Sequence, residues 1–230
     1  MPSAEPAAGH GPDTIAAIAT PPGRGAIGIV RVSGARAPEI ARRLIGRLPE
    51  ARRASFAAAR DAAGRPIDEG LALYFPEPRT YTGEHCFEFH GHGGAVVLHA
   101  VLAACLDAGA RLAEPGEFTR RAFLNGHMDL AQAEAVADLI DAASTEAARS
   151  AMRSLAGEFS AAIHALGAQL VELRALTEAT LDFPEEEVDA LHRDDAAARL
   201  ARLRADLDQL LARSREGSLL RAGIQVVIAG

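Results

Sequence analysis

The sequence contains no lysine and no tryptophan, and it has only two cysteines. All 24 basic residues are therefore arginines, and 31 acidic residues outnumber them, which gives a formal net charge of −7. This balance argues against a domain whose whole surface binds phosphate backbones, although it leaves room for a local basic patch. Cys86 and Cys105 are too few for a disulfide framework, so nothing indicates a secreted, disulfide-rich fold.

Long hydrophobic runs are also missing. The longest apolar stretch, residues 95–105, falls well short of the roughly 20 residues that a membrane-spanning helix needs. The first 12 residues are rich in proline, glycine and alanine, and they lack both the basic start and the apolar core of a signal peptide. We expect residues 1–12 to form a disordered tail, and we expect a cytoplasmic protein.

Alanine and other apolar residues are abundant instead. Hydrophobic residues make up 49% of the 230-residue chain, whereas aromatic residues contribute 4%. This composition allows a sizeable core and favours helices. The first 120 residues alternate short β-branched runs with apolar helical segments, which predicts an α+β domain rather than a doubly wound sheet. We expect strands over residues 13–20, 27–32, 71–75, 86–90 and 111–113, and helices over residues 38–48 and 95–108.

The composition changes after Pro115, beyond which strand signals almost disappear. Residues 131–156 are strongly helical, and large apolar residues then recur every three or four positions over residues 155–173, which predicts a long helix with one apolar face. Pro184 breaks this pattern. A second leucine seam over residues 200–210 predicts another long helix, and together they indicate a helical bundle or hairpin with mainly intramolecular packing.

The densest group of functional side chains lies between Glu84 and His92. Side chains alternate along an extended strand, so Glu88, His90 and His92 share one face. Two histidines and a carboxylate can bind a metal ion. The carboxylate could instead accept two parallel hydrogen bonds from an amino-pyrimidine-like ring. A solvated strand face without a ligand is the third interpretation.

Two arginines and one aspartate complete the candidates. Arg31 interrupts an apolar strand, so its side chain must leave the core or meet an acid, and Glu88 is a candidate partner unless both face a ligand. Arg24 lies in the Pro- and Gly-rich loop 21–25, whose backbone could hold an anion. Both arginines also fit purely structural roles. Asp129 is predicted to cap the helix that follows it.

Five segments, in chain order, resemble the MnmE (TrmE) family of bacterial tRNA-modification GTPases. They are residues 13–34 (DTIAAIATPPGRGAIGIVRVSG), 81–94 (YTGEHCFEFHGHGG), 115–140 (PGEFTRRAFLNGHMDLAQAEAVADLI), 181–186 (LDFPEE) and 217–230 (GSLLRAGIQVVIAG). The resemblance implies an N-terminal α/β dimerisation and tetrahydrofolate-binding domain over residues 13–120. It also implies the first part of an all-α helical domain over residues 121–222. Residues 223–230 would be the first strand of a truncated G domain.

The family resemblance implies an activity for the full-length parent. Such a GTPase works with the flavoprotein MnmG and adds a carboxymethylaminomethyl-type group to C5 of the tRNA wobble uridine. A one-carbon unit comes from 5-formyl- or 5,10-methylene-tetrahydrofolate. The expected partners are a second copy of the chain, MnmG and tRNA, with no membrane. The sites for GTP, magnesium and potassium would lie beyond residue 230, so we expect no GTP hydrolysis by this stretch.

The family's folate contacts match three residues here. An arginine in the second strand corresponds to Arg31, and a glutamate in the TGE-containing block corresponds to Glu88. A family lysine corresponds to His127, a departure that fits the absence of lysine from the chain. Gly230 corresponds to the first glycine of the phosphate-binding loop. The resemblance implies no catalytic residue and no metal ligand in this stretch. The alternative function is a non-catalytic dimerisation or docking scaffold that has lost folate binding.

Overall fold

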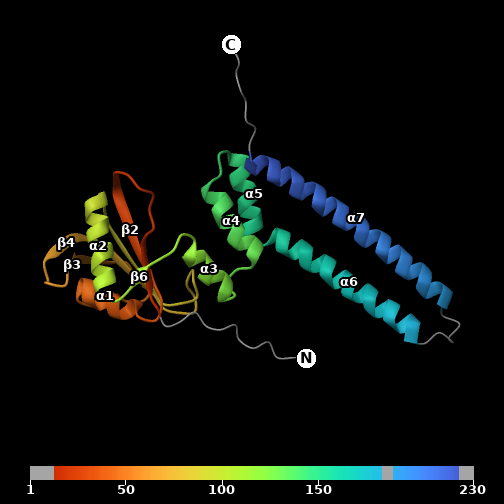
Figure 1. The fold of residues 1–230 in the computed structure, drawn as a ribbon, viewed down its shortest axis with the longest axis horizontal. Helices are drawn as coiled ribbons and strands as arrows, with labels where there is room; N and C mark the ends of the chain where they lie inside the picture. The colour runs from red at the N-terminus through yellow and green to blue at the C-terminus, as the bar shows by residue number, and fades with distance from the viewer. Residues whose placement is uncertain (1–12, 183–188, 223–230) are drawn as a thin grey trace, which may run out of the picture. The chain divides into compact units, whose positions relative to one another are not determined.

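The computed structural model describes residues 13–182 and 189–222. The chain divides into two compact units, Met1–Met128 and Asp129–Gly230. The first contains a sheet with helices, and the second is helical (Figure 1). This is the expected order of an α+β domain followed by an all-α domain.

The first unit is built on a six-stranded sheet with the strand order β3-β4-β5-β2-β1-β6. The strands are β1 (Ile15–Ile18), β2 (Gly25–Ser33), β3 (Ser55–Arg60), β4 (Pro66–Phe75), β5 (Cys86–Gly93) and β6 (Arg111–Leu112). Neighbouring strands run antiparallel except β1 and β6, which are parallel. The sheet is therefore of the α+β kind and not doubly wound.

Side-chain alternation gives the sheet one buried face and one open face. On β2, Val30 and Val32 are buried in the core, whereas Arg31 between them points to the opposite side. On β5, the buried Phe87 and Phe89 likewise flank Glu88. The open face therefore carries the polar residues that the sequence analysis selected.

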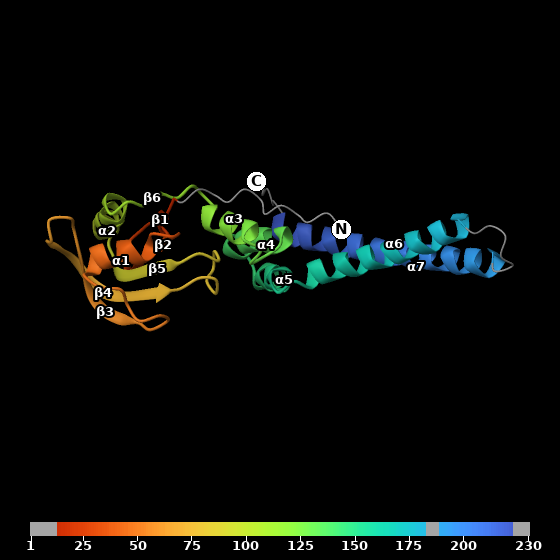
Figure 2. The same cartoon turned by 90° about the horizontal axis from the view of Figure 1, so that it is seen from below.

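Helices α1 (Ala37–Ile45) and α2 (Ala95–Asp107) cover the buried face and complete one hydrophobic core with it. Both lie beside the strands in Figures 1 and 2. A Cβ atom at Gly28 would lie 2.5 Å from a methyl group of Leu98, so the glycine allows α2 to approach β2 closely. The core thereby fixes the two central strands.

The helical unit consists of α4 (Leu130–Ile140), α5 (Thr145–Leu155), α6 (Glu158–Asp182) and α7 (Asp189–Ala222). Asp129 caps α4, as expected, through a capping box with Gln132. Residues 131–156 are helical, as expected, but they form two helices, α4 and α5, rather than one. The chain breaks after α4, and Ser144 begins α5 by accepting a hydrogen bond from the amide of Ala147.

Helices α6 and α7 lie side by side in both views (Figures 1 and 2). Their pairing agrees with the interpretation of two seams that pack against each other. Several seam residues nevertheless stay open, including Ile163 at 44% and Leu170 at 54% exposure. Among the described residues, no helix has both the length and the apolar character needed to cross a membrane.

The structural division falls after Met128, later than the expected boundary between residues 120 and 121. The reason is α3 (Glu117–Leu124), whose residues Glu117 and Arg121 are buried in the first unit. The predicted tail over residues 1–12, the helix break at Pro184 and the terminal strand over residues 223–230 with Gly230 lie outside the described residues.

Candidate ligand-binding site

The predicted partnership of Arg31 and Glu88 is present on the open face of the sheet. The two residues face each other across β2 and β5. Nε of Arg31 donates a hydrogen bond of 2.8 Å to Oε1 of Glu88, and the two side chains are 30% and 14% exposed. Directly opposed strand positions bring side chains into contact, so the register itself positions the ion pair.

His90 lies two residues after Glu88 on β5, on the same open face of the sheet, and contacts the same carboxylate. Its Nε2 atom lies 2.9 Å from Oε2 of Glu88, and since an ionised carboxylate only accepts hydrogen bonds, the imidazole donates. Each oxygen of Glu88 therefore accepts one N–H within the described residues. A carboxylate has about four lone-pair sites, so Glu88 can accept further donors from a ligand.

Arg31 also keeps donors available. Among the described residues only its Nε atom has a hydrogen-bond partner, so both terminal nitrogens can bind a ligand. The guanidinium carbon lies 5.5 Å from the ring centre of Tyr81 and 5.8 Å from that of Phe118. These cation–π contacts hold the side chain in place over the sheet.

His127 lies against the loop that carries Tyr81. A Cβ atom at Gly83 would be 2.7 Å from the His127 ring, and Gly83 has a φ of +81°, which favours glycine. Asn125 secures the same loop by donating a 2.7 Å hydrogen bond to the carbonyl of Thr82. The imidazole of His127 makes no hydrogen bond to the described part of the chain and is therefore open to a ligand.

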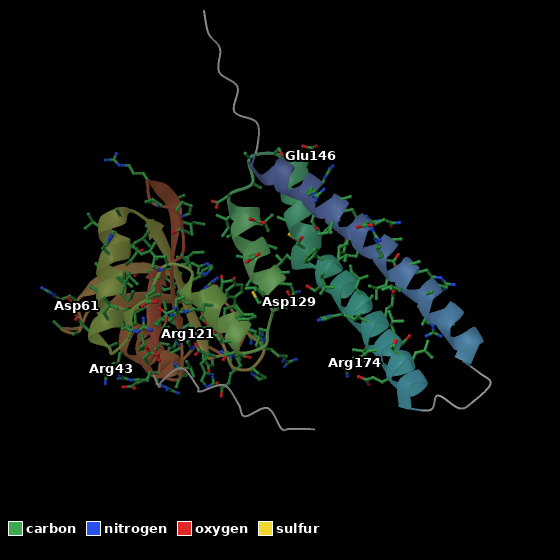
Figure 3. All side chains as sticks on the ribbon, turned by 45° about the vertical axis from the view of Figure 1, so that its right-hand side comes forward. Arg43, Asp61, Arg121, Asp129, Glu146 and Arg174 are labelled. Atoms are coloured by element: carbon green, nitrogen blue, oxygen red, sulfur yellow. The ribbon has the colours of Figure 1, made fainter. Side chains whose placement is uncertain are left out.

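The buried Arg121, which was not selected from the sequence, holds the loop that carries Tyr81 and Gly83 through an ion pair with Glu84. Arg121 is 2% exposed, and its Nη1 atom lies 3.0 Å from Oε1 of Glu84. Glu84 in turn accepts a 2.7 Å hydrogen bond from the hydroxyl of Ser33 at the end of β2. Figure 3 shows Arg121 among the side chains of the first unit. The network joins β2 and the loop to α3.

Glu117 is the second buried member of this network. Its side chain is fully buried and accepts hydrogen bonds from Arg111 at 2.6 Å and from Arg121 at 3.0 Å. These hydrogen bonds, that from Arg111 foremost, lower the pKa of Glu117 to about 2. At Asp13 burial acts to raise the pKa, but hydrogen bonds from both arginines outweigh it and lower the pKa. The acids therefore stay charged near neutral pH.

The metal-site alternative is wrong for the described residues. His92 turns away from Glu88 and His90, and its Nδ1 atom lies 2.7 Å from Oδ1 of Asp68 on β4. Burial opposes ionisation of Asp68, but hydrogen bonds from the side chain and backbone of His92 lower its pKa. Nowhere in the described ranges do three metal-ligating side chains gather around one point.

The remaining sequence candidates give weaker sites. Arg24 is exposed in the loop before β2 and has no hydrogen-bond partner among the described residues. Cys105 is fully buried, and burial raises the pKa of its thiol to about 12, so it is unreactive. Cys86 is also buried, with its sulfur 3.4 Å from the Thr82 hydroxyl.

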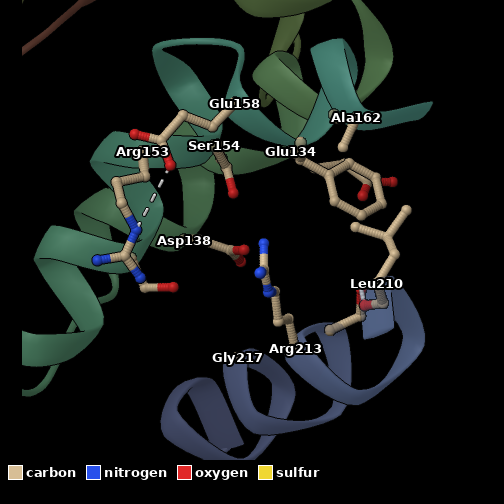
Figure 4. Close-up of a pocket in the computed structure, with 14 residues that line it drawn as sticks. Glu134, Asp138, Arg153, Ser154, Glu158, Ala162, Leu210, Arg213 and Gly217 are labelled. Carbon is tan, nitrogen blue, oxygen red and sulfur yellow. Dashed lines mark hydrogen bonds and ion pairs between the residues drawn. The ribbon is translucent and has the colours of Figure 1, made fainter. Parts of the chain in front are cut away.

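The helical unit contains a pocket of about 420 Å³ between its helices. Figure 4 shows Arg213 of α7 pointing into it toward Asp138 of α4. On its rim, Nε of Arg153 lies 3.8 Å from the carboxylate of Glu158. The lining mixes acidic, basic and small residues, and no sequence motif pointed to it.

Comparison with known proteins connects both units to one family. Residues 14–127 match the family described as the N-terminus of the GTP-binding protein TrmE, and residues 130–225 match the MnmE helical domain. Two curated relatives named tRNA modification GTPase MnmE come from Thiobacillus denitrificans and Aromatoleum aromaticum. They are 59% and 60% identical over 95% of this chain and 49% of their own length. The chain thus spans about half the length of these relatives. It belongs to the MnmE (TrmE) family.

Proposed function

We propose that the first unit binds a reduced folate, 5-formyl- or 5,10-methylene-tetrahydrofolate, through Arg31, Glu88 and His127. The observation that carries this proposal is the carboxylate of Glu88. It is held between Arg31 and His90 on an otherwise open sheet face. The amino group and ring N–H of a pterin are paired donors that suit such a carboxylate.

The other two residues complete the proposed site. The free terminal nitrogens of Arg31 suit a carbonyl oxygen or the glutamyl tail of the ligand. His127 replaces the lysine of the family and supplies a hydrogen-bond donor in its neutral form. Tyr81 and Gly83 place both side chains around one loop, which supports a single site rather than two.

We further propose that the chain is part of a protein that modifies tRNA and hydrolyses GTP, as the names of its relatives state for them. The full-length parent would act in the cytoplasm with MnmG on C5 of the wobble uridine, using the folate one-carbon unit. GTP, magnesium and potassium would bind beyond residue 230, and Gly230 would correspond to the first glycine of the phosphate-binding loop. No catalytic residue is proposed within residues 1–230.

The first unit is also the proposed dimerisation domain. Phe56 on β3 and Leu71 on β4 are paired neighbours on the open face of the sheet. Their side chains are 66% and 44% exposed. Two neighbouring apolar side chains on one face are what a second copy of the chain would bury.

A folate titration by calorimetry tests the central proposal. The chain should bind 5-formyl-tetrahydrofolate saturably. The double variant Arg31→Ala/Glu88→Ala should bind at least about 100-fold more weakly, because two charge-assisted contacts worth about 1.5–3 kcal/mol each are lost. The control Glu39→Ala/Arg43→Ala removes an exposed ion pair of α1 and should bind like the wild type.

Substitutions at His127 separate the two candidate functions. Under the folate proposal, His127→Ala weakens binding and His127→Lys restores or strengthens it. If a folded dimer binds no folate even with lysine at this position, the scaffold alternative replaces the folate proposal.

A further inference from the structure

The charge of the chain is divided unequally between its two units. Residues 13–128 contain 14 arginines and 12 acidic residues, whereas residues 129–230 contain 10 arginines and 18 acidic residues. The net charge of −7 therefore comes from the helical half, and the first unit is slightly basic. Within the first unit, residues 36–65 alone hold eight arginines and three acidic residues.

Two of these arginines, Arg42 and Arg52, lie near the end of β4, and Arg79 follows that strand in the chain. The amide of Arg52 donates a 2.8 Å hydrogen bond to the carbonyl of Tyr74, and its guanidinium lies 5.9 Å from the ring centre of Phe75. The same guanidinium donates to the carbonyl of Arg79. Burial raises the pKa of Tyr74, and nearby Glu77 adds to this effect, whereas the positive charge of Arg42 opposes it. Arg42 therefore lies close to the same tyrosine.

Two further arginines extend this surface, which we name the β4-end patch: Arg42, Arg47, Arg52, Arg53 and Arg79. Arg47 donates to the carbonyl of Phe56 at the start of β3, beside the end of β4. Arg53 pairs with Glu50 at 2.7 Å. All five arginines are exposed. With Glu50 and Glu77 as the acids beside them, the patch keeps a surplus of positive charge.

The unpaired arginines are what makes the patch suited to an external anion. Arg42, Arg47 and Arg79 have no carboxylate partner among the described residues. Arg52 is the one described non-glycine residue with positive φ, at +61°. Such a conformation is strained and persists because the surrounding structure holds it. Here the hydrogen bond to Tyr74 holds it.

We propose that the β4-end patch binds the phosphate backbone of an RNA, which is the tRNA substrate if the proposed function is correct. Arginine binds phosphate oxygens through paired N–H groups, and several such contacts in one patch supply affinity without base readout. Within the patch, Arg42 and Arg52 lie beside the buried Tyr74, and Arg52 also lies over the half-buried Phe75. Beside the patch Phe56 and Leu71 are exposed, but these two side chains belong to the proposed dimer surface and do not form an amphipathic helix that would insert into a lipid surface. RNA therefore fits better than a membrane.

A tRNA-binding experiment on the 230-residue chain tests this proposal. The probe is a fluorescent, unmodified tRNA transcript, and anisotropy gives the Kd at several KCl concentrations. The patch variant is Arg42→Gln/Arg47→Gln/Arg79→Gln. The control Arg202→Gln/Arg204→Gln/Arg215→Gln makes the same charge change on exposed positions of α7. Circular dichroism and a melting curve show whether each variant is folded.

We expect the patch variant to bind tRNA at least about tenfold more weakly than the control at ~0.1 M salt. Its slope of log Kd against log salt should fall by about 2, because each lost phosphate contact removes about 0.7–0.9 from the slope. The conservative variant Arg42→Lys/Arg47→Lys/Arg79→Lys should keep most of the slope, since it retains the charge.

The inference fails if the patch variant and the control bind tRNA equally, or if the wild type binds anionic phospholipid vesicles but no tRNA. A parallel titration with 5-formyl-tetrahydrofolate separates this test from the proposed folate site. Patch-dependent tRNA binding without folate binding would support the patch and overturn the folate proposal. Normal folate binding with no effect of the patch on tRNA would do the reverse.

Discussion

The two units of this chain bury their side chains to very different extents. In the first unit, large side chains such as Phe87, Phe89 and Ile40 are fully buried, and so are the charged Glu117 and Arg121. Among the described residues of the helical unit, only two alanines, Ala135 and Ala151, are buried. Side chains that are packed on all sides hold one geometry, which a binding site requires.

This difference explains where the candidate chemistry lies. The core of the first unit fixes β2 and β5, and their register brings Arg31 to Glu88. The helical unit instead exposes apolar residues, among them Ile140 at 78% and Leu200 at 54%. Helix caps and a few buried side chains hold its helices. It therefore positions fewer groups of polar side chains rigidly than the first unit does.

Removing Arg121 should produce the largest change, and only in the first unit. Arg121→Ala leaves the fully buried Glu117 and the partly buried Glu84 without their shared partner, which costs about 3–5 kcal/mol. The adjacent control Arg120→Ala loses a half-exposed contact to Glu114 and a long 3.9 Å approach to Glu117, and it should cost less than about 1 kcal/mol. Urea unfolding followed by tyrosine fluorescence reports the first unit alone, because both tyrosines lie there. Equal costs would show that the network does not stabilise the unit.

Acidic pH should weaken the first unit through Glu117. Its pKa is lowered from 4.5 to about 2 in the folded state. The stabilisation is therefore complete above about pH 4.5 and is lost as pH falls toward 2, on the order of 3 kcal/mol in total. Urea unfolding by tyrosine fluorescence between pH 6 and 2.5 measures it. Glu117→Gln should remove this part of the pH dependence, and an unchanged profile would refute the assignment.

Gly83→Ala should have a smaller effect on stability but a specific effect on the site. The new Cβ strains a backbone with φ of +81° and pushes the His127 ring away. Gly64→Ala is the matched control, with φ of +77° and nothing within 4 Å of its Cβ. Both should lose about 1 kcal/mol from backbone strain, but only Gly83→Ala should weaken folate binding. Equal folate affinities would remove His127 from the proposed site.

The smallest expected effect concerns the helical unit. Asp129→Ala removes the capping box at the start of α4 and should cost about 1 kcal/mol. The control Ser144→Ala removes the simpler cap of α5. Thermal unfolding followed by circular dichroism at 222 nm measures both. We expect the tyrosine signal of the first unit to be unaffected by either change, and a matching loss there would contradict independent units.

The sequence predicts the central strands well because β-branched and aromatic residues alternate there. It misses β3, whose sequence SFAAAR is dominated by alanine and has no strand propensity of its own. Pairing with β4 along its whole length makes it a strand. The sequence also does not reveal the break between α4 and α5. Residues on both sides favour a helix, so the capping role of Ser144 is not evident from the sequence.

The site itself could be predicted in part. Arg31 in an apolar strand and the alternation around Glu88 both pointed to the open face. Arg121 could not be selected from the sequence, because its partners Glu84 and Asp13 are distant along the chain. Only its spacing of four residues from Glu117 signalled a link along one helix.

The most direct test of the account is a crystal structure of the chain with 5-formyl-tetrahydrofolate. The pterin ring should lie on the open sheet face, with its amino group and ring N–H bonded to the carboxylate of Glu88 and with Arg31 and His127 contacting the ligand. A folate bound in the pocket of the helical unit, or a folate that leaves the Arg31–Glu88 pair untouched, would contradict it.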